Sequence, residues 1–160
     1  MKIIIAPDKF KGSLTSIEAC DAIKKGIAGA GDNIELLLFP MADGGDGFAE
    51  VLKYYLHTET QLVETVDPLG RRTSASYEWN KQDLVAIIEL AAASGLMMLT
   101  KEERNPLVTS TFGTGLQIKD AIGRGANKII LGIGGSATND GGTGILAALG
   151  FSILDKKITF

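Results

Sequence analysis

The residues most able to do chemistry lie in a glycine-rich segment, Gly132–Gly144, where six of thirteen positions are glycine. Because glycine has no Cβ, main-chain N–H groups in such a segment can approach an anion closely. A helix that starts within the segment would add a favourable dipole. A tight turn that needs positive φ angles is the alternative, but a single turn rarely requires six glycines. We therefore predict that this segment binds phosphate, through Gly134, Gly135, Ser136, Thr138 and Asn139.

Three aspartates in glycine-rich surroundings could bind a metal or accept a proton. Asp140 would repel an anion directly, so we predict that it is a Mg²⁺ ligand, with general base as the alternative role. Asp43 and Asp46 lie in the segment Asp43–Gly47, directly before a predicted helix. For Asp46, helix capping and Mg²⁺ binding are alternatives. Asp43 lies farther from the helix start, and we predict that it is catalytic.

A third segment combines a carboxylate with basic residues directly after the first predicted strand. It contains Asp8, Lys9 and Lys11, and lysines beside a strand end can hold phosphate or carboxylate groups as point charges. We predict that Asp8 and Lys11 are catalytic, whereas for Lys9 a solvated surface position is an equal alternative. Arg104 lies in a charged loop and could bind a carboxylate through two parallel hydrogen bonds, with a solvated surface again as the alternative.

Of two common nucleotide-binding motifs, the sequence lacks one and matches the other without its expected structural context. The P-loop pattern G-x-x-x-x-G-K-[ST] is absent, whereas Gly132, Gly134 and Ala137 match the dinucleotide pattern G-x-G-x-x-[GA]. Asp155 follows at about the expected distance of 20 residues. That pattern should open a helix at once, but Asn139–Gly142 intervenes. An NAD-dependent oxidoreductase domain therefore remains an alternative to a phosphate-binding enzyme.

Apolar patterns predict the strands and helices that position these segments. Continuous apolar runs predict buried strands at Ile3–Ala6, Ile34–Phe39 and Lys128–Ile133. Helical periodicity and a capping box at Thr15–Glu18 predict helices from about Thr15 and over Phe48–His57, Ala91–Leu99, Thr114–Gly123 and Thr143–Leu149. Turn residues separate three further predicted strands, Thr60–Val66, Thr73–Trp79 and Leu84–Leu90. Another strand is predicted to begin at Phe151–Leu154.

The order of these elements predicts an α/β fold with a mostly parallel sheet flanked by helices. The middle strands predict an antiparallel insert at residues 59–90, which forms part of a second α/β domain. Residues 1–58 and 91–160 would then be parts of one α/β domain. Because no terminal helix follows the last predicted strand, we expect the fold to be incomplete.

Composition narrows the classes of function. The chain has 45% hydrophobic residues, a net charge of −3 and a pI near 5.2, which argues against disorder and against nucleic-acid binding. Its most apolar stretch, Leu84–Ala93, is too short for a membrane span and contains Glu89. One cysteine and one histidine cannot form an internal disulfide or a His/Cys zinc site. We therefore expect a cytoplasmic protein without a nucleic-acid or membrane partner.

Four segments in the correct order resemble the signature blocks of bacterial glycerate kinases. They are Ala6–Leu14, Pro40–Gly47, Glu103–Leu107 and Gly132–Gly142. The resemblance implies two α/β domains with a cleft between them, and transfer of the γ-phosphoryl group of ATP, with Mg²⁺, to a hydroxyl of D-glycerate. We expect 2-phosphoglycerate as the product rather than the 3-phosphoglycerate that other members form. Asp46 stands where glutamate is usual, and Phe48 stands where threonine is usual.

The resemblance also suggests roles for the candidate residues. Asp43 or Asp8 would act as the base or as a Mg²⁺ ligand, and Lys11 and Arg104 would hold carboxylate or phosphate oxygens. Family chains are more than twice as long, so we expect the first part of a glycerate kinase that lacks kinase activity alone. The remaining alternative is a non-catalytic truncated module that needs a partner or pairs with itself as a homo-oligomer.

Overall fold

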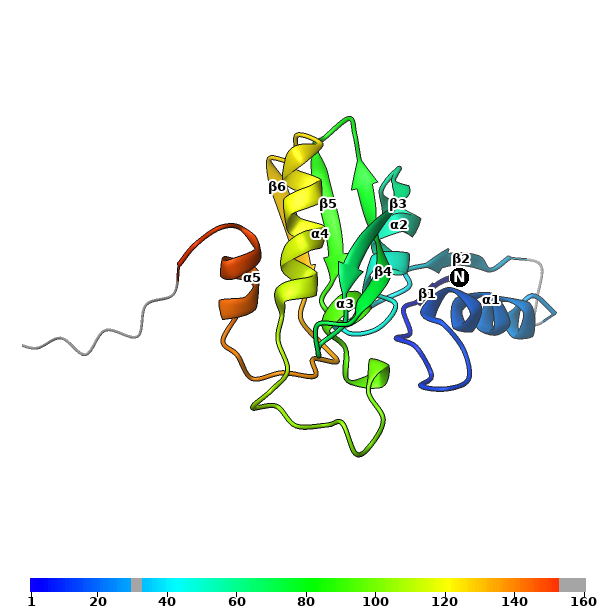
Figure 1. Cartoon of the computed structure of the whole chain (residues 1–160). Coiled ribbons are helices and arrows are strands. Elements are labelled where there is room, and N and C mark those ends of the chain that lie inside the picture. The colour runs from blue at the N-terminus through cyan, green and yellow to red at the C-terminus, as the bar shows by residue number, and fades with distance from the viewer. Residues whose placement is uncertain (30–32, 153–160) are drawn as a thin grey trace, which may run out of the picture.

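The computed structural model describes residues 1–29 and 33–152, and it arranges them around two β-sheets (Figure 1). A two-stranded sheet pairs β1 (Lys2–Ile5) with β2 (Glu35–Leu38) in parallel. A four-stranded sheet has the order β3-β4-β5-β6. Its strands are β3 (Glu59–Val66), β4 (Arg72–Asn80), β5 (Val85–Glu89) and β6 (Lys128–Gly132).

Helices connect and cover these strands. They are α1 (Ser16–Ile27), α2 (Phe48–Tyr55), α3 (Ala91–Ser94), α4 (Phe112–Gly123) and α5 (Thr143–Ala148), with a 3₁₀ turn η1 (Leu96–Met98) after α3. The predicted capping box at the start of α1 is confirmed. Thr15 Oγ1 accepts a hydrogen bond from Glu18 N at 3.2 Å, and Glu18 Oε2 accepts one from Thr15 N at 2.8 Å. Two main-chain donors at the helix start are therefore satisfied locally.

The four-stranded sheet mixes two kinds of pairing. The pairs β3–β4 and β4–β5 are antiparallel, as the alternating middle segments predict, whereas β5–β6 is parallel. The parallel pair needs a crossover, which runs through α3 and α4. The α/β class is therefore confirmed. The boundary expected at residue 90 runs through one sheet, since Glu89 of β5 pairs with Gly132 of β6; the division into domains itself stays a prediction.

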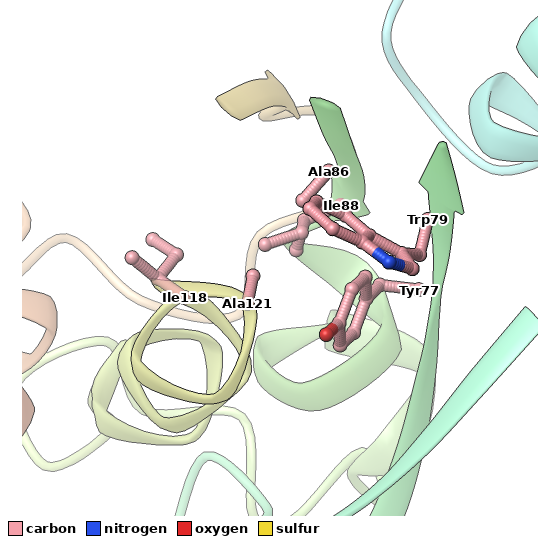
Figure 2. Close-up of a cluster of buried hydrophobic side chains, with 6 residues drawn as sticks. All are labelled: Tyr77, Trp79, Ala86, Ile88, Ile118 and Ala121. Atoms are coloured by element: carbon pink, nitrogen blue, oxygen red, sulfur yellow. The ribbon is translucent and has the colours of Figure 1, made fainter. Parts of the chain in front are cut away.

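The main hydrophobic core lies between the four-stranded sheet and α4. On one face of β4 and β5, Tyr77, Trp79 and Ile88 point towards Ile118 and Ala121 of α4, as Figure 2 shows. Strand residues alternate between faces, so the neighbours of these core residues lie on the opposite face. They include two carboxylates, Glu78 and Glu89, which hydrogen-bond to residues of α2. The sheet is therefore apolar towards α4 and partly acidic towards α2.

Three segments depart from the prediction. The helix expected over Ala91–Leu99 is interrupted at Gly95, whose backbone is extended with φ −85° and ψ 146°. Helix α4 begins at Phe112, earlier than expected. Phe151 and Ser152 are not in a strand. The rest of that predicted strand, and Asp155, lie outside the described residues.

Among residues 1–29 and 33–152, no helix combines the length and the hydropathy that a membrane crossing requires.

The core between the sheet and α4 gives a stability prediction. Ile88 is fully buried, so Ile88→Ala should lower the free energy of unfolding by about 2–5 kcal/mol, through lost apolar contact and the cavity left behind. Leu62 is 68% exposed, and Leu62→Ala should cost less than about 1 kcal/mol. Urea unfolding of both variants measures this difference. Equal losses would contradict the described core.

Candidate functional site

Two glycine-bearing loops touch at the carboxyl ends of β5 and β6. We call Asp43–Gly47 the acidic loop and Gly132–Gly144 the glycine-rich loop. Gly134 N donates a hydrogen bond to Gly44 O at 2.9 Å. A Cβ added at Gly134 would lie only 2.5 Å from the Cα of Gly45, and one added at Gly132 would lie 2.7 Å from the ring of Phe48. These glycines are required because the two backbones approach too closely for side chains.

The acidic loop holds Asp43 in an ionised and well-supported position. Asp43 Oδ1 accepts a hydrogen bond from Gly45 N at 2.9 Å. That bond, assisted by the positive charges of Lys9 and Lys11, holds the pKa of the Asp43 carboxyl below its usual range. Lys9 Nζ also donates to the carbonyl oxygen of Asp46. The sequence leaves a solvated and a binding position open for Lys9. In the structure, Lys9 joins the loop after β1 to the acidic loop.

A cavity of about 440 Å³ lies between the loop after β1 and the start of α2. Of the predicted residues, Asp8, Lys11 and Asp46 line it. Apolar side chains line it as well, among them Phe10 and Met41, which are 56% and 51% exposed. The volume falls within the range of small-molecule pockets. The combination of cations, carboxylates and exposed apolar groups suits an anionic organic ligand.

The amides of the predicted phosphate-binding residues are partly engaged inside the chain. Gly134 N donates to the acidic loop, and Thr138 N donates to Ser136 Oγ at 3.2 Å. Thr138 Oγ1 donates to Thr109 O at 2.7 Å, so this hydroxyl joins two loops. The remaining predicted positions, Gly135, Ser136 and Asn139, are exposed. Phosphate binding by the five residues stays a prediction, and the exposed three are the better placed.

Arg104 does not line the cavity. Its loop is held by its neighbour Glu103, whose carboxylate accepts from Arg71 Nη1 at 2.6 Å and from Thr100 N at 3.0 Å. Arg71 also pairs with the buried carboxylate of Asp67 at 2.5 Å. The side chain of Arg104 is exposed, so its binding role stays a prediction.

Asp140 is occupied by hydrogen bonds between two helix starts. Its Oδ2 accepts from Thr111 N at 2.7 Å and Gly144 N at 3.2 Å, and its Oδ1 accepts from Gly142 N at 2.9 Å. Burial would raise the pKa of this carboxyl, but the main-chain hydrogen bonds outweigh burial and hold the pKa below its usual range. The contacts show that Asp140 joins the starts of α4 and α5. Metal binding by Asp140 stays a prediction, and it would have to replace these bonds.

Within residues 1–29 and 33–152, no three or more histidine, cysteine, aspartate or glutamate side chains are grouped as a metal site. A Mg²⁺ ion commonly takes only one or two protein carboxylates and completes its shell with water and substrate phosphates. The exposed acidic loop fits that need better than Asp140 does. A Cβ added at Gly135 of the glycine-rich loop would lie 3.2 Å from Asp46 Oδ1, so this carboxylate of the acidic loop lies beside the glycine-rich loop.

One residue of this region was not predicted as functional. Glu89 ends β5, and its Oε1 accepts a hydrogen bond from Ala49 N of α2 at 2.7 Å. The available signal was a lone carboxylate in the most apolar stretch of the sequence. A charge in such a stretch requires a partner, because burying it alone is costly.

The contact between the two loops gives a second prediction. Gly134→Ala should destabilise the chain by about 1–3 kcal/mol, because the added methyl meets main-chain atoms that cannot rotate away. Gly26 lies in α1 with no atom within 4 Å of an added Cβ, so Gly26→Ala should instead stabilise by about 0.5–1 kcal/mol. Urea unfolding provides both values. An unchanged unfolding midpoint for Gly134→Ala would rule out the close contact.

The partly buried hydrogen bonds of Asp140 give a pH prediction. Because its pKa is lower in the folded chain, its stabilisation is present above the unfolded pKa of about 3.9 and is lost as pH falls through the folded value. Asp140→Asn should therefore cost about 1–3 kcal/mol at pH 7, and less at pH 3. Unfolding free energies of both proteins at the two pH values test this. The exposed Asp21→Asn serves as the control, and an equal cost at pH 3 and pH 7 would contradict the role.

Comparison with known proteins identifies relatives of the whole chain. The model of the glycerate kinase family matches residues 3–159. A glycerate kinase of Halalkalibacterium halodurans is 47% identical over 155 residues, which are 97% of this chain and 41% of that protein. The glycerate 2-kinase of Escherichia coli is 43% identical over 157 residues, which are 98% of this chain and 41% of that protein.

A solved structure gives the same result for the fold. A protein assigned as glycerate kinase 2 in Salmonella typhimurium LT2 superposes with a TM-score of 0.81 at 44% identity, covering 94% of this chain and 41% of that one. The chain thus spans about two fifths of the length of the relatives it matches. Since the family model covers nearly every residue, the chain belongs to the glycerate kinase family.

Proposed function

We propose that this chain supplies the acceptor-activating part of an ATP-dependent glycerate kinase. The observation that carries the proposal is the contact between the acidic loop and the glycine-rich loop beside a cavity that contains Lys11. A carboxylate, a cation and glycine-rich amides at one sheet end are the groups that phosphoryl transfer requires, because the enzyme mainly positions reactants and neutralises charge. The names of the relatives, glycerate kinase and glycerate 2-kinase, support the choice of acceptor.

In the proposed reaction, Asp43 accepts the proton of a glycerate hydroxyl. The hydroxyl oxygen forms a bond to the γ-phosphorus of ATP, and the bond from that phosphorus to the β,γ-bridging oxygen breaks, so ADP leaves with the electron pair. Lys11 and Arg104 hold carboxylate or phosphate oxygens, Arg104 through its two-pronged guanidinium. Asp8, which lines the cavity, is the alternative base.

Asp46 is the better supported of the two predicted Mg²⁺ ligands, because its carboxylate is exposed while that of Asp140 is hydrogen-bonded. When bound, Mg²⁺ would neutralise phosphate charge. Asp43 is the second carboxylate of the acidic loop and would share this task or act as base. Gly135, Ser136 and Asn139 would bind phosphate oxygens at the adjoining loop.

We propose 2-phosphoglycerate as the product and the cytoplasm as the compartment. An NAD-dependent oxidoreductase is not favoured, because the relatives are named as kinases. Gly134, which that alternative needs for a cofactor, also uses its amide to bind the acidic loop. Self-association as a homo-oligomer remains a prediction for sedimentation to test.

A product-resolved kinase assay tests the proposal. The chain is assayed alone and joined to the remaining segment of the Halalkalibacterium halodurans relative, with separation of 2- and 3-phosphoglycerate. We expect ATP-dependent 2-phosphoglycerate formation by the joined protein only. Asp43→Ala should lower its kcat by at least about 10²-fold, whereas Asp21→Ala on α1 should not change it.

If the folded joined protein forms no phosphoglycerate, the proposed function is refuted. Near-normal turnover by the Asp43→Ala variant would remove that residue from the mechanism. Robust turnover by the 160-residue chain would contradict the expectation that it is inactive alone.

A further inference from the structure

The start of α2 has no side-chain cap of its own. Its N-cap residue is Gly47, which has a φ of 84° and no side chain to accept a hydrogen bond from the first turn. The first amides of a helix have no partner inside the helix, so another group must accept them. Ala49 N finds that acceptor in Glu89 Oε1 at 2.7 Å, forty residues further along the chain.

Glu89 lies where β5, the end of β6 and the start of α2 come together. It is the last residue of β5, and its partner across the parallel ladder is Gly132, the first residue of the glycine-rich loop. The next amide, Leu90 N, donates to Gly132 O at 2.9 Å. One residue therefore connects the ends of both parallel strands with the helix that directly follows the acidic loop.

The acidic loop depends on such outside contacts for its position. Its main chain is bound to the glycine-rich loop through Gly44 O, and to the loop after β1 through the side chain of Lys9. Glu89 adds the contact at its helical end. Burial raises the pKa of the Glu89 carboxyl, and the amides of Ala49 and Gly47 act in the opposite direction. The contact with Ala49 N requires a hydrogen-bond acceptor at this position.

We infer that Glu89 is a positioning residue for the acidic loop. From the end of β5 it caps α2, and this contact keeps the acidic loop aligned with the glycine-rich loop. The inference rests on the proposed function for its catalytic consequence, since the residues positioned are Asp43 and Asp46. It predicts that removal of the acceptor displaces the acidic loop while the core of the sheet stays intact. It also predicts that Glu89→Gln preserves the position of the acidic loop, because glutamine retains an acceptor oxygen.

Amide hydrogen exchange on the 160-residue chain tests the contact directly. Glu89→Ala should speed the exchange of Ala49 N at least about 10-fold and move the resonances of Gly45 and Gly134, while the amide of buried Ile87 is unaffected. Glu89→Gln should stay within about 3-fold of the original rate. Glu78→Gln is the matched control. Glu78 faces the same helix, but it binds Lys53, Thr58 and Thr60.

Unchanged exchange at Ala49 in Glu89→Ala, or Glu89→Gln as damaging as Glu89→Ala, would overturn the inference. If Glu89→Ala does not fold, Glu89→Asp replaces it. The shorter side chain keeps the charge but withdraws the acceptor by about one methylene, so it should also speed exchange at Ala49. Exchange at the original rate in Glu89→Asp would likewise overturn it.

Kinetics of the joined protein supply a second readout. Glu89→Ala should lower kcat about 10-fold or more with the KM for ATP within about 3-fold, and Glu89→Gln should restore kcat, because misplacement of reacting groups affects the chemical step. Loss confined to KM would contradict positioning. If the unsubstituted joined protein shows no kinase activity, the proposed function fails, while the exchange experiment still decides the role of Glu89.

Discussion

The arrangement of the candidate site depends on a main-chain contact that only glycine permits. Gly134 approaches Gly45 so closely that a single methyl group would collide with the neighbouring backbone. The contact places the acidic loop at the carboxyl ends of β5 and β6, where open α/β sheets bind their ligands. The carboxylate of Asp46 lies beside Gly135 of the glycine-rich loop in this arrangement.

Carboxylates that lie outside α2, α4 and α5 accept main-chain hydrogen bonds at the starts of these helices. Both α2 and α5 begin after a glycine in the left-handed conformation, and neither N-cap residue has a side chain to offer. Glu89 supplies the acceptor for α2, and Asp140 supplies it for α5 and, through Thr111, for α4. The same residue types that suggest metal binding in the sequence thus act here as acceptors of main-chain hydrogen bonds.

Local patterns predict much of the fold, because they follow from neighbours in the chain. The capping box at Thr15 and the antiparallel strands are of this kind, and both are found. Strands also form at the three apolar runs predicted as buried, but the prediction of burial is wrong for most of their residues: only Ile5 of β1 and Gly132 of β6 are buried, and Ile4 is 63% exposed. The pairing of β5 with β6 brings together segments about forty residues apart, and no local pattern encodes it. The sheet that this pairing forms crosses the expected boundary at residue 90, and the division into domains stays a prediction.

The candidate site was predictable in its residue types more than in its geometry. Glycine excess marks the two loops that touch in the structure, but an excess of glycine is equally suited to binding an anion and to letting two backbones touch. Asp140 shows the same ambiguity, since the sequence does not reveal that Thr111 lies beside it. Glu89 was visible as an isolated charge among apolar residues, yet its partner on α2 emerges only from the fold.

The contact between Gly44 and Gly134 has a consequence for how the family can vary. It joins carbonyl oxygen to amide nitrogen, so it involves no side chain of the acidic loop. The residue at position 46 can therefore change without removing this contact, whereas Asp43 also binds the loop backbone through Gly45 N. At position 46 the fold thus separates the shape of the loop, which the main-chain contact maintains, from the chemistry of the side chain that the loop carries.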